Sequence, residues 1–471
     1  MCPQPVFFLL PATAALALAA SLAAQPVAPQ IHQWNLSPEG PTLHWTDAGP
    51  GQVYTVQICE SFEDPLWITP RTPFPWPVPT RTWTDQTAPP NDTRFYRVLA
   101  SPAANRGSLL RTDTIESYTK TQINFMLSLL GVPLAAQYDV TVHRLTYETL
   151  DPWGGRTEAT GAIALPVSPT KPLPLCSYQH GTLAERSEAP SYNSSIERFL
   201  GVALAASGYV ATLPDYLGLG GSPLIHPYHH ADSQATAAVD MLRAARTACA
   251  ARSLSLNGQL FLIGYSQGGH ATLALHRDLE QYHASEFTIT ASAPMAGAYD
   301  LSGVTTTDVL SGRPMPNPYY FALILASYQS VYRLAPSLAD LLAPEYQTTL
   351  PPLLDGQHTG EEINAILPQD VTRVLHPNVL AGLRTRPNHP LRQALRDNDL
   401  YRWTPQAPLR LYHCGGDQDV IIANSQVALA AFHARGATHV ELVVPDPNAD
   451  HGGCIVPSAL LAKTWFDSLK Q

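Results

Sequence analysis

A serine placed between glycines, at the junction of an apolar run and a helical pattern, constrains the fold of this chain most strongly. The segment Gly264-Tyr265-Ser266-Gln267-Gly268 follows the apolar residues 260–263 and precedes a helical pattern at 269–276. A G-x-S-x-G segment between a strand and a helix turns so sharply that the serine takes strained backbone angles. Its hydroxyl then projects above the carboxyl edge of a sheet, at a helix N-terminus that favours negative charge. The sequence therefore predicts that Ser266 is a nucleophile.

Strand and helix patterns alternate on both sides of Ser266. Such alternation specifies a mostly parallel sheet with helices on both faces, so the predicted class is α/β. A helical pattern at 114–130 precedes the first strands. The expected strands are 140–147, 159–165, 173–178, 209–213, 260–263, 287–293, 409–412 and 439–444, and the expected helices are 194–206, 231–251, 269–283, 424–435 and 457–469.

The first hundred residues follow different patterns. Residues 1–24 are mostly apolar or small and end in Ser21-Leu22-Ala23-Ala24, which suits an export signal, although the first five residues carry no Lys or Arg. Residues 26–104 contain short alternating strands between Gly- and Pro-rich turns, which predicts a small all-β sandwich. The turn Trp83-Thr84-Asp85 and the strand at 95–98 resemble fibronectin type III-like modules of secreted bacterial enzymes. This resemblance implies a spacer or a module that contacts a surface or polymer. Residues 101–112 are expected to form a linker to a catalytic domain at 113–471.

Residues 300–404 interrupt the alternation with Pro-rich helical segments, including 319–333 and 338–342. An insertion of roughly 100 residues between two late strands indicates a helical lid or cap over the site. The segment 319–333 is apolar over most of its helical circumference, so it must be buried. The surface available to it is the top of the substrate pocket.

Composition narrows the classes of partner. The formal net charge is -10 and no basic run occurs, which argues against a nucleic-acid partner. No stretch after the leader is long and apolar enough to span a bilayer. Beyond Cys2, five cysteines remain and none has zinc-ligand spacing, so no metal and no cofactor is expected. We therefore expect a secreted or periplasmic protein. The five cysteines are Cys59, Cys176, Cys249, Cys414 and Cys454.

A serine nucleophile needs a base, an acid that orients the base, and an oxyanion hole. In sheets of this class the catalytic groups lie on loops at the carboxyl ends of strands. The loop at 413–420 carries Asp417 and Asp419, and the loop at 445–453 carries His451. The chain order serine, aspartate, histidine is that of α/β-hydrolases and differs from the orders in chymotrypsin and subtilisin.

With these loops, residues 113–471 resemble the α/β-hydrolase superfamily, in particular its secreted lipases and esterases. The family's acid loop, H-G-x-x-D-x-x-V, places the acid on Asp417, with Cys414 at the usual glycine position and Asp419 as the alternative. The resemblance places the base on His451. Because the two loops meet at the active site, we also predict a disulfide between Cys414 and Cys454. The other matching segments are 179–182 (Gln-His-Gly-Thr), 214–218 (Pro-Asp-Tyr-Leu-Gly), 226–228 (His-Pro-Tyr) and 231–233 (Ala-Asp-Ser).

Two backbone N–H groups are expected to form the oxyanion hole. One belongs to Gln267, which follows the nucleophile, and the other to Thr182, with Leu183 as the alternative. His226, His229 and His230 form a cluster on one loop without a matching distant ligand set, which favours structural roles over a metal site.

The sequence thus predicts a secreted serine hydrolase that acts on small-molecule or lipid esters through Ser266, Asp417 and His451. A serine peptidase or amidase is the alternative within enzymes, because the same residues also cleave amides. A catalytically idle adhesion or carbohydrate-binding protein is the alternative outside them. Such a protein would not react with a fluorophosphonate.

Overall fold

The structure is a computed structural model that describes residues 29–63, 65–71, 76–88 and 93–471. The expected export signal at 1–24 lies outside these residues. Across the part of the chain that is described, no helix has both the length and the apolar character needed to cross a bilayer.

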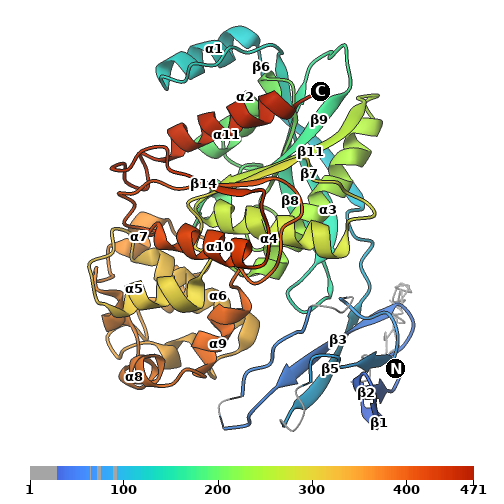
Figure 1. The fold of residues 1–471 in the computed structure, drawn as a ribbon, viewed down its shortest axis with the longest axis vertical. Helices are drawn as coiled ribbons and strands as arrows, with labels where there is room; N and C mark the ends of the chain where they lie inside the picture. Colours follow the sequence, from blue (N-terminus) through green and yellow to red (C-terminus); the bar gives the residue numbers. More distant parts are fainter. Residues whose placement is uncertain (1–28, 64, 72–75, 89–92) are drawn as a thin grey trace, which may run out of the picture.

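A nine-stranded sheet forms the centre of the molecule (Figure 1), in the order β14-β13-β12-β11-β9-β10-β8-β7-β6. The six strands from β14 to β10 pair in parallel, and β8, β7 and β6 extend the sheet by antiparallel pairing. This arrangement confirms the predicted α/β class. The strands are β6 Leu109–Tyr118, β7 Val140–Leu150, β8 Arg156–Pro166, β9 Leu173–Gln179, β10 Val210–Pro214, β11 Leu256–Tyr265, β12 Ala291–Met295, β13 Leu409–Tyr412 and β14 Val440–Val443.

Helices cover both faces of this sheet. On one face, α1 (Lys120–Leu129), α2 (Ile196–Ala206) and α11 (Ile455–Leu469) contribute apolar side chains to a core shared with the central strands. On the other face lie α3 (Ala231–Ala250), α4 (Gln267–Tyr282) and α10 (Ala423–Ala434). Burial from both sides explains why the sequences of β9 and β10 are mostly apolar, since every residue of both strands is buried.

The segment before the central strands differs from the prediction. Residues 109–118 form strand β6, which pairs with β7, and β5 extends to Pro102. Both ends of the expected linker at 101–112 and the first residues of the expected helix at 114–130 therefore belong to strands. The helix α1 begins only after Thr119, whose side chain forms a capping box with Gln122. Pairing with β7 holds this segment in a strand, although the spacing of its apolar residues suits a helix. The sequence did not reveal this pairing, because the partner strand begins more than twenty residues later in the chain. Strand β12 also begins four residues later than the expected strand at 287–293.

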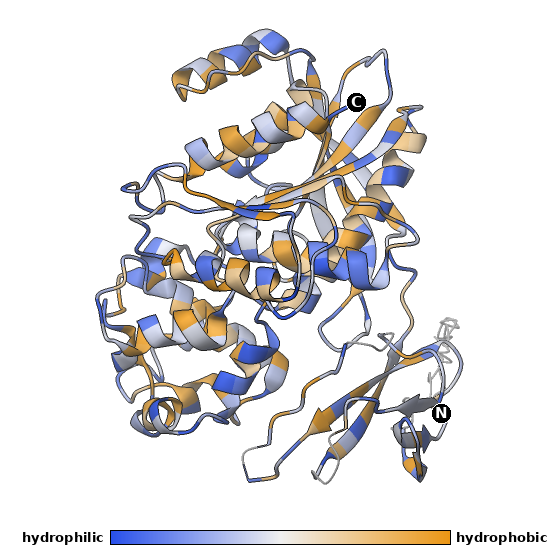
Figure 2. Ribbon diagram, viewed as in Figure 1, coloured by the Kyte–Doolittle hydropathy of each residue, from blue (hydrophilic) through white to orange (hydrophobic). Residues whose placement is uncertain are grey.

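The insertion between β12 and β13 contains short helices around an apolar core of its own. It lies beside the carboxyl edge of the sheet (Figure 1), and Figure 2 shows apolar residues along its helices α5 and α6. The expected helix at 319–333 is α6, while 338–341 is a 3₁₀ turn. The α-helices of the insertion are α5 Thr306–Leu310, α6 Tyr319–Tyr332, α7 Gly360–Asn364, α8 Pro377–Thr385 and α9 Pro390–Asp397.

The N-terminal region forms two small sheets, β1-β2-β4 and β3-β5. Strand β1 was not predicted, and its residues are almost all exposed. The two sheets share a core that contains Trp45, Tyr54 and Trp83. The strands are β1 Ile31–Ser37, β2 Gly40–Trp45, β3 Gln52–Cys59, β4 Thr82–Thr84 and β5 Phe95–Pro102.

Candidate active site

Ser266 occupies the turn between β11 and α4, as the sequence predicts. Its backbone angles are φ 61° and ψ -120°, which a residue with a side chain rarely adopts. The backbone N–H of Ser266 donates to the carbonyl oxygen of Met295 at 2.9 Å, and this contact helps to hold the strained turn. Such strain persists only where the surrounding structure imposes it, and it is concentrated at functional sites.

The glycines of the pentapeptide are required by close backbone contacts. A Cβ atom on Gly268 would lie 2.0 Å from the carbonyl oxygen of Gln179, and one on Gly264 would lie 2.6 Å from the same oxygen. Both distances are far below van der Waals contact. The turn can therefore approach the end of strand β9 only with glycine at these two positions.

Ser266, His451 and Asp417 form a hydrogen-bonded chain. The Oγ of Ser266 lies 2.9 Å from Nε2 of His451, and Nδ1 of His451 lies 2.6 Å from Oδ2 of Asp417. The three side chains come from the ends of β11, β14 and β13, which meet at one edge of the sheet. The hydroxyl of Tyr265 donates to the carbonyl oxygen of His451 at 2.6 Å and fixes the position of that loop.

The structure also distinguishes the two candidate acids. Asp417 is buried and its Oδ1 accepts hydrogen bonds from the backbone N–H groups of Asp419 and Val420. Burial by itself would raise the pKa of Asp417, but hydrogen bonds from His413 and His451 outweigh it and hold that pKa well below its usual range. The Asp419 carboxylate instead accepts a hydrogen bond from Asn317 of the helical insertion, at 3.1 Å. Asp417 is therefore the acid beside the histidine.

A disulfide joins the acid loop to the histidine loop. Cys414 and Cys454 are bonded, with their Cα atoms 5.8 Å apart, so the predicted pairing is present. Cys59, Cys176 and Cys249 are buried free thiols. The bond links the two loops that carry Asp417 and His451, and we expect it to limit their relative motion.

The start of α4 and the loop after β9 both carry backbone N–H groups that could form an oxyanion hole. Gln267 is the first residue of α4, so its N–H has no acceptor within the helix. In the loop after β9, Glu197 accepts the N–H of Gly181 at 3.2 Å. Within the described residues, the N–H groups of Thr182 and Leu183 have no acceptor. The geometry thus leaves both oxyanion candidates on this loop available.

The histidine cluster does not converge on one point. His226 contacts the carbonyl oxygen of Leu217 and the side-chain amide of Gln267, and His230 caps the N-terminus of α3. Burial lowers the pKa of His226 to about 4, so its ring is neutral at pH 7. No group of three or more metal-ligating side chains in the described ranges could hold a metal ion.

Two polar residues from the segments that resemble the family, Asp215 and His180, have structural partners. Asp215 is fully buried and accepts hydrogen bonds from Thr160 and Ser191. The ring of His180 packs 4.3 Å from that of Tyr216, whose hydroxyl donates to the His180 carbonyl oxygen.

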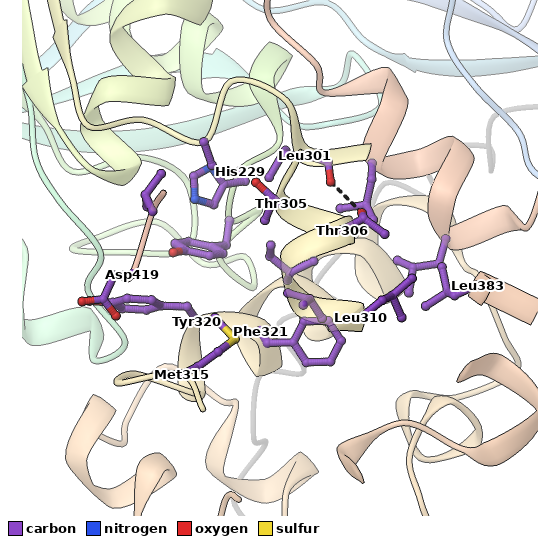
Figure 3. A pocket seen from close by; sticks show the side chains of 17 residues that line it. His229, Leu301, Thr305, Thr306, Leu310, Met315, Tyr320, Phe321, Leu383 and Asp419 are labelled. Carbon is purple, nitrogen blue, oxygen red and sulfur yellow. Dashed lines mark hydrogen bonds between the residues drawn. The ribbon is translucent and has the colours of Figure 1, made fainter. Parts of the chain in front are cut away.

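A mostly apolar cavity of about 70 Å³ lies at the helical insertion, next to the loop that follows Asp417 (Figure 3). The insertion contributes most of the wall, including Phe321 and Ile324 of α6. Asp419 and Val420, which follow Asp417, line one side of the cavity. Tyr228 also lines it, and the Tyr228 hydroxyl lies 2.8 Å from Thr182 Oγ1 on the oxyanion loop. The sequence predicted an apolar pocket under α6, but it did not indicate that His229 lines it. A loop histidine with a buried ring has no local sequence signal.

Comparison with known proteins decides the family. The secretory lipase family matches residues 183–469. The chain belongs to the secretory lipase family. As a secretory lipase it is an ester-hydrolysing enzyme, and the family's name indicates secretion.

Solved structures agree with this assignment. A rice cell wall degrading esterase, LipA from Xanthomonas oryzae, is 31% identical over 77% of this chain and 96% of that chain, with a TM-score of 0.67. A putative hydrolase from Legionella pneumophila is 28% identical over 77% and 98% of the two chains, with a TM-score of 0.71. Candida antarctica lipase A in its closed state is 17% identical with a TM-score of 0.56, which shows a shared fold alone. Among curated proteins, none matches the chain.

Proposed function

We propose that this secretory lipase is a serine carboxylic-ester hydrolase that works through an acyl-enzyme on Ser266. The observation that carries the proposal is the chain of hydrogen bonds from Ser266 Oγ to His451 Nε2 and from His451 Nδ1 to Asp417 Oδ2. A serine hydroxyl is a weak nucleophile until a base accepts its proton, and this geometry supplies the base and orients it.

The first half of the proposed reaction forms the acyl-enzyme. His451 Nε2 takes the proton of Ser266 while Oγ attacks the ester carbonyl carbon. Negative charge on the carbonyl oxygen is stabilised by the backbone N–H of Gln267 and by that of Thr182, with Leu183 as the alternative. The tetrahedral intermediate then collapses, and His451 protonates the leaving alcohol.

The second half returns the enzyme to its starting state. Water gives a proton to His451 Nε2 and attacks the acyl carbon, and Ser266 leaves with the proton that His451 returns. Asp417 keeps the histidine tautomer with Nδ1–H and stabilises the imidazolium that forms in each half. None of these steps requires a metal or a cofactor.

We further propose that the helical insertion acts as a lid whose cavity receives the acyl chain. The cavity wall supports this assignment, because it is mostly apolar and reaches the loops of Asp417 and Thr182. We assign residues 26–104 as a fibronectin type III-like module and 1–24 as an export signal, by the sequence patterns described above.

A fluorophosphonate probe tests the mechanism directly. The probe phosphonylates a serine only when its base and oxyanion hole are in place. We expect stoichiometric labelling, with the modified peptide containing Ser266, and hydrolysis of p-nitrophenyl esters but not of aminoacyl p-nitroanilides. Labelling of another serine would refute the assignment of Ser266. Faster cleavage of the anilides than of the esters would favour a peptidase, and an unlabelled protein would indicate an idle binding module.

A further inference from the structure

Among the described residues, one ring nitrogen in the cavity wall has no hydrogen-bond partner. Thr306 donates its hydroxyl proton to the carbonyl oxygen of Leu301 at 2.6 Å, and Asp419 accepts from Asn317. Thr305 reaches Asn424 at 3.3 Å. By contrast, among the described residues the Nδ1 of His229 has no hydrogen-bond partner, although the residue is only 5% exposed.

The position of His229 is determined by its backbone and its neighbours. Its φ of 54° is rare for a residue with a side chain, and its carbonyl oxygen accepts a hydrogen bond from the Tyr328 hydroxyl at 3.2 Å. The rings of Tyr228 and His270 pack edge-on against it at 4.4 and 4.7 Å. Figure 3 shows the ring on the side of the cavity opposite Met315. The imidazole is therefore held at the cavity by contacts that leave its Nδ1 without a hydrogen bond.

A buried His229 Nδ1 without a hydrogen bond costs free energy. Burial lowers the pKa of His229 well below its usual range, so the ring is neutral and offers one donor and one acceptor. Leaving a buried polar group without a partner costs free energy, because the group has lost its hydrogen bonds to water. An unbranched alkyl chain in the cavity would leave that cost in place, whereas a chain with a hydroxyl group would remove it.

We propose that His229 forms a hydrogen bond with a hydroxyl group on the acyl chain of the substrate. The enzyme would therefore prefer esters of short hydroxyalkanoic acids over esters of unsubstituted alkanoic acids. The proposal rests on the proposed function, because it assigns the cavity to the acyl group. The remaining wall is mostly apolar and would pack against the methylenes on either side of the hydroxyl. His229 would then be a specificity-determining residue that takes no part in bond making or breaking.

Pairs of matched esters test the proposal. We would measure kcat/KM by pH-stat for methyl hexanoate, methyl 3-hydroxyhexanoate and methyl 6-hydroxyhexanoate. The quantity of interest is the ratio of each hydroxylated ester to methyl hexanoate, because the fraction of active enzyme cancels in it. We expect at least one ratio of about ten or more in the wild type, since sites built to bond a hydroxyl discriminate strongly against analogues without it.

Substitutions at His229 test whether its imidazole ring causes the preference for hydroxylated esters. In His229→Phe, which keeps an aromatic ring and removes both nitrogens, we expect the ratio to fall to about one or below. In His229→Asn, which tolerates positive φ, we expect a drop of at least about threefold, and this variant replaces the first if that one fails to fold. Thr306→Val is the matched control, because its hydroxyl is already bonded to Leu301, and its ratio should stay at the wild-type value.

Two results would overturn the proposal. One is a wild-type enzyme that hydrolyses methyl hexanoate but shows no ratio above one, and the other is a ratio that His229→Phe leaves unchanged. Either result leaves the proposed ester hydrolysis intact. Failure to hydrolyse any of the three esters would instead overturn the proposed function together with this inference.

Discussion

Arg71 in the N-terminal region and Asp278 in helix α4 form a buried ion pair, with Nη2 of Arg71 3.0 Å from Oδ1 of Asp278. The two residues are 207 positions apart in the sequence. Arg71 also lies 3.1 Å from Asp232 at the start of α3, and its guanidinium stacks on the ring of Trp76. The N-terminal region is thereby attached to α4, the helix that follows Ser266, and to α3, the helix that precedes strand β11.

Removing the arginine should destabilise the whole enzyme. The side chain of Asp278 is 2% exposed, so Arg71→Met leaves a buried carboxylate without its charged partner. We expect the free energy of unfolding to fall by about 3 to 5 kcal/mol, measured by urea denaturation at pH 7. Arg81→Met is the control, because Arg81 and Asp47 form an exposed pair at 3.8 Å that should contribute less than about 1 kcal/mol. Equal losses in the two variants would contradict the prediction.

The loss in Arg71→Met should also depend on pH. Burial raises the pKa of Asp278, but the hydrogen bond to His283 and the charge of Arg71 together lower it below its usual range. A lowered carboxyl pKa contributes stability above the unfolded value of about 4, and this contribution is lost as pH falls through the folded value. The difference between wild type and Arg71→Met should therefore be largest at neutral pH and shrink as the pH falls below about 4.

This attachment was not foreseen from the sequence. The sequence indicated only that residues 26–104 form a small β-sandwich that acts as a spacer or as a module contacting a surface or polymer. A single arginine in a Pro-rich, aromatic segment gives no sign of a partner two hundred residues later. The same limit explains β6 and His229, whose strand pairing and burial depend on distant parts of the chain.

The features that sequence did predict are local or carried by a family pattern. The turn at Ser266 is specified by its own pentapeptide and by the periodicities on either side. Asp417, His451 and the Cys414–Cys454 bond were expected from short loops after two strands. Parallel strands bring their carboxyl ends to one edge, so residues on such loops meet even when far apart in sequence. The structure places these residues together, and their catalytic roles remain to be tested by substitution.

Ser266→Ala should abolish most turnover without changing the fold. We expect kcat for p-nitrophenyl butyrate to fall by several powers of ten, because His451 then has no hydroxyl to deprotonate. Circular dichroism should match the wild type, and the protein should no longer react with a fluorophosphonate. Retention of more than about a tenth of the wild-type rate would refute the role of Ser266, since that is far above the residual activity of other triad variants.

The two aspartates should differ sharply. Asp417→Asn keeps the shape of the residue but favours the wrong tautomer of His451, and kcat should fall by roughly three to four powers of ten. Asp419→Asn should cost less than about tenfold, because its carboxylate contacts Asn317 and not the histidine ring. Both variants lose one negative charge at nearly the same place, so each controls for the other. The opposite ranking would transfer the role to Asp419.

The disulfide should stabilise the site. Cys414→Ser combined with Cys454→Ser opens a covalent loop with a sequence separation of 40, and we expect a loss of about 3 to 4 kcal/mol in the free energy of unfolding. A reductant should lower the melting temperature of the wild type and leave that of the double variant unchanged. Peptide mapping of the unreduced protein that found both thiols free would exclude the bond.

The cavity should set the preferred acyl length. Each methylene that packs in it should contribute up to about 0.8 kcal/mol, or about fourfold in kcat/KM, until the cavity is full. Across p-nitrophenyl esters from acetate to palmitate, we expect a rise followed by a plateau or fall. Phe321 lines the cavity, so Phe321→Ala should move the optimum to longer chains.

A matched variant separates this effect from simple loss of stability. Leu350 is fully buried in the core of the insertion and does not line the cavity, so Leu350→Ala should lower stability and leave the optimal chain length unchanged. If Phe321→Ala and Leu350→Ala shift the optimum equally, the cavity does not bind the acyl chain. A flat profile in the wild type would lead to the same conclusion, because a site that gains nothing from added methylenes does not bury them.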